Sequence, residues 1–511
     1  MSLRSFTYQD LVARNATLYG NRAAFTDEER SLTHAQYAER VAQLAGGLAR
    51  CGIRAGDRIA ALLPNGTLFV EVLGATAHIG AILVPVNTRL SREEVWHVLD
   101  DTKPSLVVMS AEFEGLLPDA LPEGVSVIRS AGSRPGALSL GDLYEDGADF
   151  LPAALSDDAG FLIIHTAAVG GRARGALLTH RGVLGASSFA SVAWQLSSAD
   201  VNVGVLPLFH LAGISLLLAV QQAGGASVLL RSFAAESLVD RILQVQGSVI
   251  GTFPPMLAAV TKICVERGEL LPSLRVVTGL DSPETIDGFH KACPGASFWA
   301  GYGQTETSGI IAMAPASDRI GSAGRPIPVN VLRIVDEEGR SVPAGQVGEI
   351  VLKGPMVFGG YWGLAPEQQP SFRAGWHHTG DLGRIDSEGY LWYAGRSPEK
   401  ELIKSGGENV YPAEVERCLR EHPEIEEAVV FGAPDEQWGE IVCAACEPRQ
   451  GCEPEIADLV DFVASRIARY KRPKQIWLVP SLPRTASQAI DRDAVKRAYS
   501  PPPIRSEFTG P

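Results

Sequence analysis

One glycine-bearing stretch has the residue types of a phosphate-binding loop. Residues 165–175 read HTAAVGGRARG and follow the apolar run FLIIH. Glycines after a strand let backbone N–H groups converge on an anion, and side-chain hydroxyls usually add to them. Only Thr166 supplies a hydroxyl here, and the spacing Gly170–x₄–Gly175 is followed by an alanine and a leucine. A P-loop requires a lysine and then a serine or threonine at those places, so this is not a Walker A loop.

Four further stretches place polar residues between glycines or beside basic residues. They read GYGQTETSG (301–309), GWHHTGDLGRIDSEGYLWYAGR (375–396), KELIKSGGENVYPAEVE (400–416) and YKRPK (470–474). Together with HTAAVGGRARGALLTH, and in this order, they resemble the motifs of the adenylate-forming superfamily of acyl-CoA synthetases, luciferases and peptide-synthetase adenylation domains. The resemblance runs from near residue 10 to near residue 498. It implies an enzyme that activates a carboxylate with ATP, releases pyrophosphate, and then rotates its C-terminal domain so that CoA attacks the acyl-adenylate.

The resemblance assigns contacts for ATP, AMP and Mg²⁺. Tyr302 offers a flat face for adenine, Thr305 a hydroxyl for the α-phosphate, and Glu306 a hard oxygen for Mg²⁺. Asp381 accepts both ribose hydroxyls, and Arg396 brings a fixed charge to the ribose or phosphates. Taken alone, Glu306 could be a solvated carboxylate at a helix start and Tyr302 a core residue. Asp381 and Arg396 alone would more often be surface-turn residues.

The same resemblance implies positions for the hinge, the acyl pocket and CoA. The hinge falls at Lys400, with the two residues after Arg396 read as an insertion. His210 in PLFHLAG matches a position that gates the acyl pocket, although a satisfied core histidine is an equal alternative. Thr278 and Gly279 are expected to line the same cleft. Candidates for the CoA side are Gly406, Gly407, Trp438, Lys471 and Arg472. The glycines permit close approach to a pantetheine arm, whereas the tryptophan and the basic pair could equally be a packed side chain and a solvated charge cluster.

Two departures from the family pattern affect the handling of ATP. The family loop is rich in Ser, Thr and Gly, whereas this chain has alanines and a valine there and Arg174 in place of a lysine. Backbone N–H groups, Thr166 and Arg172 or Arg174 are left to steer a triphosphate. In PRTASQAIDR, Ala489 occupies the place of a family lysine that bridges the carboxylate and the α-phosphate.

The missing lysine predicts slow adenylation. Loss of one such charge costs about 2.7–4 kcal/mol, while thioester formation uses the other domain orientation and need not suffer. A deliberate Lys→Ala change would not explain the altered loop 300 residues earlier. Two weakened ATP-handling sites in one chain therefore favour divergence.

Alternating helical and strand patterns predict the elements that position these residues. Two α/β layers extend to about residue 315, the second beginning with FLIIH, and a small β-rich unit covers about 320–396. We expect an N-terminal AMP-binding body over 1–396 and a mobile α+β lid domain over 397–511. The apolar run 203–220 is interrupted by Pro207 and His210 and is predicted to be buried core rather than a membrane span.

Composition restricts the class of protein. A formal net charge of −14 over 511 residues argues against nucleic-acid binding. Cys443 and Cys446 would point to opposite faces of a strand, which disfavours a metal or redox pair. No signal peptide begins the chain, so a reduced, cytoplasmic protein is expected, with a homodimer left open.

The sequence thus predicts an AMP-forming acyl-CoA synthetase for an apolar fatty or aromatic acid, with ATP, Mg²⁺ and CoA as partners. Two alternatives remain. One is an enzyme that only transfers a preformed acyl-adenylate, and the other is a non-catalytic relative that binds acyl-nucleotides or CoA. The sequence has no G-x-S-x-G nucleophile elbow, which disfavours a hydrolase.

Overall fold

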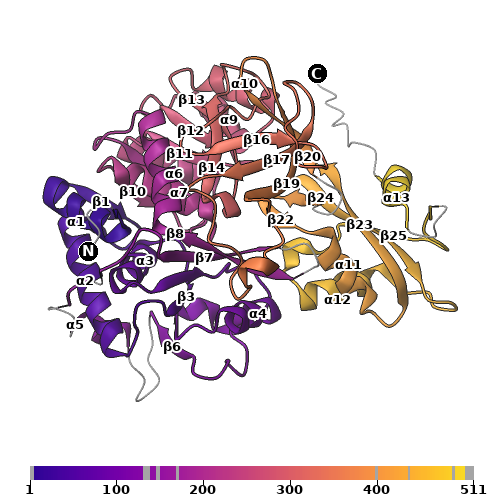
Figure 1. Cartoon of the computed structure of the whole chain (residues 1–511), viewed down its shortest axis with the longest axis horizontal. Helices are drawn as coiled ribbons and strands as arrows, with labels where there is room; N and C mark the ends of the chain where they lie inside the picture. The colour runs from indigo at the N-terminus through magenta and orange to yellow at the C-terminus, as the bar shows by residue number, and fades with distance from the viewer. Residues whose placement is uncertain are drawn as a thin grey trace.

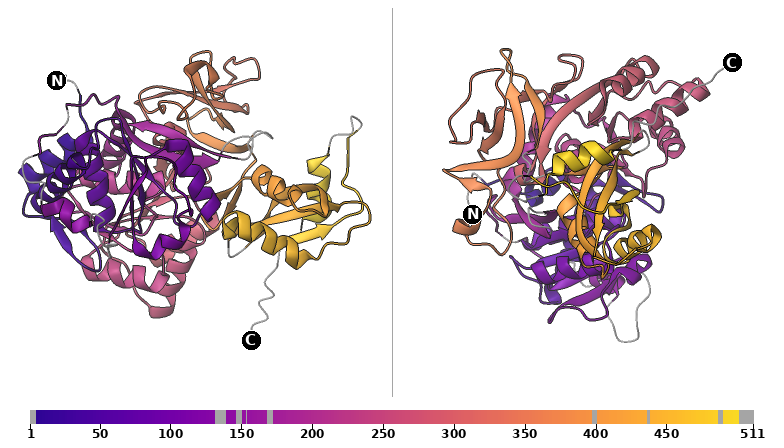
Figure 2. Two further views of the ribbon diagram at one scale, coloured as in Figure 1. Left: turned by 90° about the horizontal axis from the view of Figure 1, so that it is seen from below. Right: turned by 90° about the vertical axis from the view of Figure 1, so that its right-hand side faces the viewer.

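A computed structural model shows a large body and a smaller C-terminal domain (Figure 1). It describes residues 5–130, 139–145, 150–152, 154–167, 172–396, 401–435, 438–485 and 490–500. The mixed α/β fold with a separate C-terminal domain was predicted from the sequence, and it is confirmed. The left view in Figure 2 shows the C-terminal domain as a lobe beside the body. The exact boundary near residue 396 stays a prediction, and the expected hinge residue Lys400 lies outside the described residues.

The first layer of the body is a six-stranded sheet. Its strand order is β6 (Ser126–Arg129), β5 (Leu106–Met109), β3 (Arg58–Leu62), β4 (Ile82–Pro85), β7 (Gly160–Ala167) and β8 (Ala173–Thr179). The strands are parallel except for β8, which returns antiparallel to β7. The run FLIIH lies on β7 and therefore belongs to this layer, so its assignment to the second layer was wrong. Pattern alone cannot tell which sheet an apolar strand joins.

The second layer is a nine-stranded sheet. Its order is β15 (Arg325–Pro326), β14 (Gly309–Pro315), β13 (Ser297–Gln304), β12 (Val276–Gly279), β11 (Val249–Thr252), β9 (Val201–Gly204), β10 (Ala226–Leu229), β1 (Ala23–Thr26) and β2 (Ser31–Thr33). The central strands are parallel and buried, as expected where helices cover both faces. The N-terminal hairpin β1–β2 completes its edge by pairing with β10, which joins the start of the chain to the middle of the body's sequence.

Helices fill the space between and around these sheets. They are α1 (Tyr8–Tyr19), α2 (His34–Arg50), α3 (Thr67–Ile79), α4 (Arg92–Thr102), α5 (Leu140–Glu145), α6 (His180–Ala193), α7 (Leu211–Gln222), α8 (Ala235–Val245), α9 (Met256–Arg267) and α10 (Pro283–Ala292), with short 3₁₀ turns η1 (Ala111–Leu116) and η2 (Thr305–Thr307). Helix α4 starts with a capping box, because Ser91 and Glu94 exchange hydrogen bonds between side chain and backbone. This box fixes the Glu94 carboxylate at the first turn.

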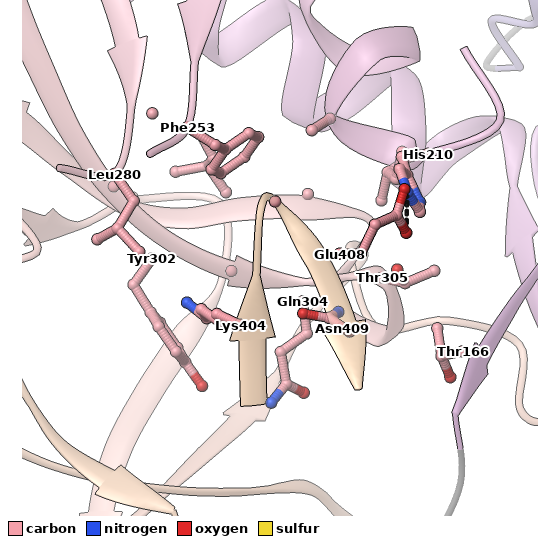
Figure 3. Close-up of a pocket in the computed structure, with 18 of the residues that line it drawn as sticks. Thr166, His210, Phe253, Leu280, Tyr302, Gln304, Thr305, Lys404, Glu408 and Asn409 are labelled. Atoms are coloured by element: carbon pink, nitrogen blue, oxygen red, sulfur yellow. Dashed lines mark hydrogen bonds and ion pairs between the residues drawn. The ribbon is translucent and has the colours of Figure 1, made fainter. Parts of the chain in front are cut away.

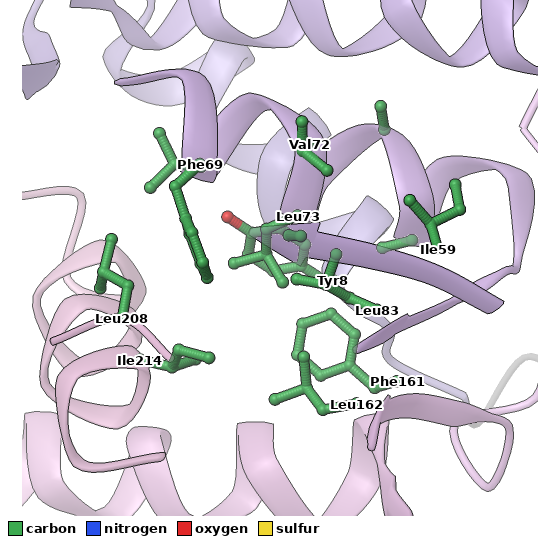
Figure 4. Close-up of a cluster of buried hydrophobic side chains, with 14 of the residues drawn as sticks. Tyr8, Ile59, Phe69, Val72, Leu73, Leu83, Phe161, Leu162, Leu208 and Ile214 are labelled. Atoms are coloured by element: carbon green, nitrogen blue, oxygen red, sulfur yellow. The ribbon is translucent and has the colours of Figure 1, made fainter. Parts of the chain in front are cut away.

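The apolar run 203–220 is core, as predicted. Its helix α7 is apolar on every side because it contributes Ile214 and Leu217 to one buried cluster and Leu216 and Val220 to another. Figure 4 shows Ile214 and Leu208 facing Phe161 and Leu162 of β7 across the first of these clusters. No helix among the described residues is long and apolar enough to span a bilayer.

A five-stranded antiparallel sheet follows the body's α/β layers, as predicted. It contains β16 (Val331–Val335), β17 (Gly348–Lys353), β18 (Phe372–Arg373), β19 (Trp376–Ile385) and β20 (Leu391–Arg396), with the 3₁₀ turn η3 (Pro366–Gln368) before β18. Strand β19 carries Asp381, which pairs in register with Arg396 on β20. The long β19–β20 hairpin thus places a carboxylate and a guanidinium opposite one another.

The C-terminal domain has a second five-stranded sheet with helices beside it. Its elements are β21 (Ile403–Ser405), β22 (Glu408–Val410), α11 (Pro412–Arg420), β23 (Ile425–Asp435), β24 (Gly439–Pro448), α12 (Ile456–Arg466), η5 (Arg469–Lys471), β25 (Gln475–Leu478) and α13 (Arg492–Tyr499). Cys443 and Cys446 lie on β24 and pack into two different buried clusters. They therefore face opposite sides of the sheet, as the strand period predicts.

Candidate active site

A cavity of about 2260 Å³ opens at the carboxyl edge of the nine-stranded sheet. The segments that follow β9, β11, β12 and β13 all line it. In a parallel sheet the carboxyl ends of neighbouring strands meet at one edge, and this edge is where open α/β sheets bind ligands. The C-terminal hairpin β21–β22 enters the same cavity (Figure 3). The cleft is therefore built by both domains.

Asp381 is the centre of a buried polar cluster in this cleft. It is 1% exposed. The Tyr302 hydroxyl donates to its Oδ2 at 2.7 Å, and the Gln304 amide donates to the same oxygen at 2.6 Å. Arg396 Nε lies 3.0 Å from Oδ1. Burial, and then the charge of Asp381, raise the pKa of Tyr302 well above its usual range, so the phenol stays protonated and remains a donor.

Glu306 is held by two hydroxyl donors. Thr166 Oγ1 donates to its Oε1 at 2.9 Å, and the Tyr361 hydroxyl donates to the same oxygen at 2.8 Å. Burial, and then Glu306, raise the pKa of Tyr361, so that this phenol is also kept as a donor. Arg174 lies over the Tyr361 ring, 5.9 Å from its centroid. The strand that carries the altered phosphate loop is thereby tied to the acidic residue of GYGQTET.

The Glu306 carboxylate suits a magnesium ion. Mg²⁺ is usually held by one or two carboxylates together with substrate phosphates and waters. Among the described residues, no three His, Cys, Asp or Glu side chains are grouped as a metal cage. Glu306 has a second oxygen that accepts from neither Thr166 nor Tyr361. This donor set fits an ion shared with a nucleotide rather than a dedicated metal centre.

The hairpin β21–β22 is shaped by two glycines. Gly406 and Gly407 have φ of +58° and +83°, in the left-handed region that favours glycine. A Cβ at Gly406 would lie 2.8 Å from Cε3 of Trp438, so the tryptophan ring covers the turn. Trp438 lines the cleft with both glycines. The turn can therefore approach a ligand closely on one side while Trp438 supports the other.

Glu408 joins the hairpin to the body. It is 3% exposed and accepts from Arg89 at 2.7 Å and from Asn87 at 3.4 Å, while His210 Nε2 lies 3.2 Å from Oε2. Burial alone would raise the pKa of Glu408, but His210 and Arg89 lower it to about 2. Figure 3 shows the contact with His210 at the hairpin's end. His210 thus meets the C-terminal domain as well as the cleft.

Lys404 brings a cation into the cleft from the same hairpin. Figure 3 places its side chain between Tyr302 and Gln304. Enclosure, and then the charge of Arg396, lower the pKa of Lys404. A lysine with a lowered pKa in a cleft that also holds the predicted nucleotide contacts is a candidate functional group.

The structure brings most of the predicted site residues into one cleft. Those that line it are Thr166, Arg174, His210, Thr278, Gly279, Tyr302, Thr305, Glu306, Asp381, Arg396, Gly406, Gly407 and Trp438. Arg172 is exposed and, like Lys471 and Arg472, is not among the lining residues. Lys400 and Ala489 lie outside the described residues. The assignments of individual roles stay predictions.

Lys471 lies at the interface between the domains instead of the cleft. Its Nζ donates to Glu414 of the C-terminal domain at 2.8 Å and to Glu94 of helix α4. Burial alone would lower the pKa of Lys471, but Glu414 and then Glu94 raise it. The Lys471 ammonium group, which the sequence made a candidate for the CoA side, is therefore already paired with two carboxylates in the interface.

Sequence reasoning missed several residues of the site. They are Gln304, Tyr361, Lys404, Glu408 and Tyr411. Gln304 and Lys404 lie inside quoted motifs, GYGQTET and KELIKSGGENVYP, but were not singled out. Tyr361 lies between motifs, and only its contact with Glu306 marks it. Glu408 is recognisable only when the two domains are seen together.

Comparison with known proteins accounts for this arrangement. The family model "AMP-binding enzyme" matches residues 12–362, and "AMP-binding enzyme C-terminal domain" matches residues 414–489. The chain is 34% identical to indoleacetate–CoA ligase of Aromatoleum aromaticum, over 95% of this chain and 97% of the relative. It is 33% identical to feruloyl-CoA synthase of an Amycolatopsis species, over 95% and 98%.

A solved structure supports the same relationship. The o-succinylbenzoate CoA synthetase of Bacillus subtilis, bound to a product analogue, superposes with a TM-score of 0.84 at 28% identity. The match covers 95% of this chain and 97% of that one. The chain therefore belongs to the AMP-binding enzyme family, within the adenylate-forming superfamily, whose relatives described here are CoA ligases.

Proposed function

We propose that this protein is an AMP-forming ligase that joins an apolar carboxylic acid to CoA. One observation carries the proposal: residues suited to a nucleotide and a glycine hairpin suited to a thiol arm line the same cleft. Among apolar acids we favour aromatic over fatty ones. The named substrates of two relatives are aromatic acids, and small residues such as Ala186 and Ala190 line the same cavity as His210 and leave room for a ring.

The first step would join the acid to the nucleotide. The substrate carboxylate attacks the α-phosphorus of ATP, the bond to pyrophosphate breaks, and an acyl-adenylate forms. In this step Asp381 would hold the ribose, and Thr305 would donate to the α-phosphate. Mg²⁺ held by Glu306 would neutralise phosphate charge when bound. Arg174, on strand β8 after the altered phosphate loop, lines the cleft and would bring a positive charge to the phosphates.

The second step would transfer the acyl group to CoA. The CoA sulfur attacks the acyl carbonyl as its proton is lost, and AMP leaves. Gly406 and Gly407 would admit the pantetheine arm, and Lys404 would face the departing phosphate. The hairpin already lies in the cleft, so the orientation of the C-terminal domain in this structure suits this second step.

Slow adenylation is part of the proposal. Ala489 lacks the ammonium group that would offset repulsion between the carboxylate and the phosphate. Together with the hairpin's position, this favours the transfer-only enzyme as the second candidate. That enzyme would convert a supplied acyl-adenylate to a thioester but release little pyrophosphate from ATP.

One experiment separates the candidates. Acid-dependent pyrophosphate release is measured over a panel of aromatic and fatty acids, with and without CoA. Release above background supports the ligase. If no pyrophosphate is released but supplied acyl-adenylates are converted to thioesters, the result supports the transfer-only enzyme. Inactivity in both assays, with measurable binding of an acyl-adenylate, would contradict both and leave a binding protein.

Restoring the lysine tests the cause of slow adenylation. The Ala489→Lys variant is expected to release pyrophosphate about 10²-fold faster, because it supplies the missing positive charge in the transition state. Thioester formation from supplied acyl-adenylate serves as the internal control and should stay unchanged. If pyrophosphate release does not rise, the altered phosphate loop is the larger defect.

A further inference from the structure

One face of helix α6 lines part of the cavity, and the space beside this face is termed the channel. Ala186, Ala190 and Trp194 recur every four residues, and all three line the cavity. Such spacing places side chains on one face of a helix, and eight residues rise about 12 Å. The two alanines leave space beside the helix, whereas Trp194 fills it two turns further along.

The outer end of this channel lies beside the reacting residues. A Cβ built at Gly309 would come within 3.5 Å of Ala186 Cβ and 3.4 Å of Ser215 Oγ. Gly309 follows the turn η2 that carries Thr305 and Glu306. A carboxylate at Thr305 would therefore direct the rest of the acid past Ala186 and toward Trp194.

Trp194 lines the cavity at the end of this face and carries an unused hydrogen-bond donor. Its side chain is 4% exposed and packs in the buried cluster with Leu216 and Val220. Its backbone carbonyl is bound by Arg275, which fixes the residue at the end of α6. The indole Nε1 is buried and has no hydrogen-bond partner among the described residues.

A buried N–H without a partner is costly, and native proteins seldom keep one without a reason. Indole nitrogen donates and cannot accept. Its natural complement is therefore an acceptor oxygen on the ligand. Ser215 Oγ, partway along the same channel, is also buried without a partner and could bind an oxygen nearer the carboxyl end.

We propose that Trp194 is a specificity-determining residue that selects acids with an ether or hydroxyl oxygen at the end opposite the carboxyl group. This inference rests on the proposed function, because it assumes that the acyl group occupies the cleft. It narrows the substrate to oxygen-substituted aromatic acids whose length matches the channel.

Binding of inert acyl-adenylate analogues tests this without depending on the rate of adenylation. The probes are sulfamoyl-adenosine derivatives of 4-methoxycinnamic and 4-ethylcinnamic acid, which match in shape but differ in one oxygen. Calorimetry of the full-length protein is expected to show about 10-fold tighter binding of the methoxy compound, the value of one net hydrogen bond. In Trp194→Phe, which keeps a ring but removes the N–H, the two affinities should become equal.

Trp299→Phe is the matched control. Trp299 packs against the same buried cluster but is not among the residues that line the cleft. This variant should retain the wild-type preference. Equal affinities in the wild type, or an unchanged preference in Trp194→Phe, would overturn the role of Trp194 while leaving the proposed function standing. Failure of both probes to bind at all would reject the proposed function and this inference with it.

Discussion

At the scale of single residues, Lys404 is the cation whose loss should separate the two steps. It enters the cleft from the C-terminal hairpin beside Tyr302, and the charge of Arg396 acts on it. We expect Lys404→Met to slow thioester formation from supplied acyl-adenylate by about 10²-fold, since a positive charge no longer faces the leaving phosphate. Pyrophosphate release should change little. An equal fall in both steps would contradict a role confined to transfer.

The lowered pKa of Lys404 also predicts a pH dependence. Because enclosure and Arg396 disfavour its charged form, Lys404 loses its proton at a lower pH than a free lysine, whose pKa is about 10.4. Thioester formation should therefore decline as the pH rises through this lowered value. Lys404→Arg keeps its charge and should move the decline to higher pH, as measured by rate profiles of the two proteins. Superimposable profiles would count against Lys404 as the titrating group.

Site residues could be predicted from the sequence where they belong to a short motif with characteristic chemistry. Glu306 and Asp381 were named from their motifs, and both lie in the cleft. Trp194 could not be found in this way, because an apolar residue at a helix end looks like any core side chain. Its distinguishing feature, a buried N–H without a partner, exists only after folding. Lys471 shows the opposite case, since a basic residue in a basic stretch proved to be a buried ion partner.

At the scale of elements, the turn of the hairpin β21–β22 should tolerate no side chain at Gly406. Gly406→Ala forces an alanine into φ of +58° and toward Trp438, 2.8 Å from its new Cβ. We expect thioester formation to fall between about 10-fold and 100-fold, because a displaced turn misplaces the thiol arm. Pyrophosphate release should be unaffected.

Gly451→Ala controls for backbone strain alone. Gly451 has φ of +82° in a turn of the C-terminal domain, and no atom would lie within 4 Å of an added Cβ. Both variants should lose about 1–2 kcal/mol of stability, the cost of the left-handed conformation, as measured by denaturant unfolding. Only Gly406→Ala should lose transfer activity. Equal loss in the two variants would show that strain, rather than the position of the turn, is responsible.

Element type was predictable from periodicity, but element partners were not. The run 203–220 was correctly placed in the core because a proline and a histidine interrupt it. The run FLIIH was correctly taken as a strand but assigned to the wrong sheet. Its neighbour β8 follows it directly in a hairpin, but its other neighbour β4 lies far earlier in the chain and pairs through Leu83 and Leu162, which no local pattern encodes. The edge hairpin β1–β2 joins the second sheet for the same reason.

At the scale of the whole molecule, the orientation of the two domains is fixed by contacts distant in sequence. Glu408 meets Arg89 and His210, and Lys471 meets Glu94. Each partner is an ordinary surface-type residue in the sequence, so none signals its role alone. Lys471 and Glu94 are both largely shielded from water, so their interaction is stronger than that of an exposed ion pair, whereas Arg89 and His210 remain partly exposed around the buried Glu408. The sequence could predict a second domain but not where it docks.

Removing a single charge from the Lys471 cluster should change the stability of the docked orientation of the C-terminal domain. Lys471 keeps Glu414 wherever the C-terminal domain moves, because both belong to that domain, but it meets Glu94 only when the domain is docked as here. Glu94→Gln keeps the acceptor that caps α4 and removes the charge. We expect thioester formation to fall on the order of 10-fold, within the usual range for coupling between distant parts of a protein. Pyrophosphate release should hold or rise.

Glu93→Gln makes the same change one residue away on the exposed side of α4 and should leave both rates as they are. Parallel decline of both steps in Glu94→Gln would mean that Glu94 stabilises the body rather than the docked orientation.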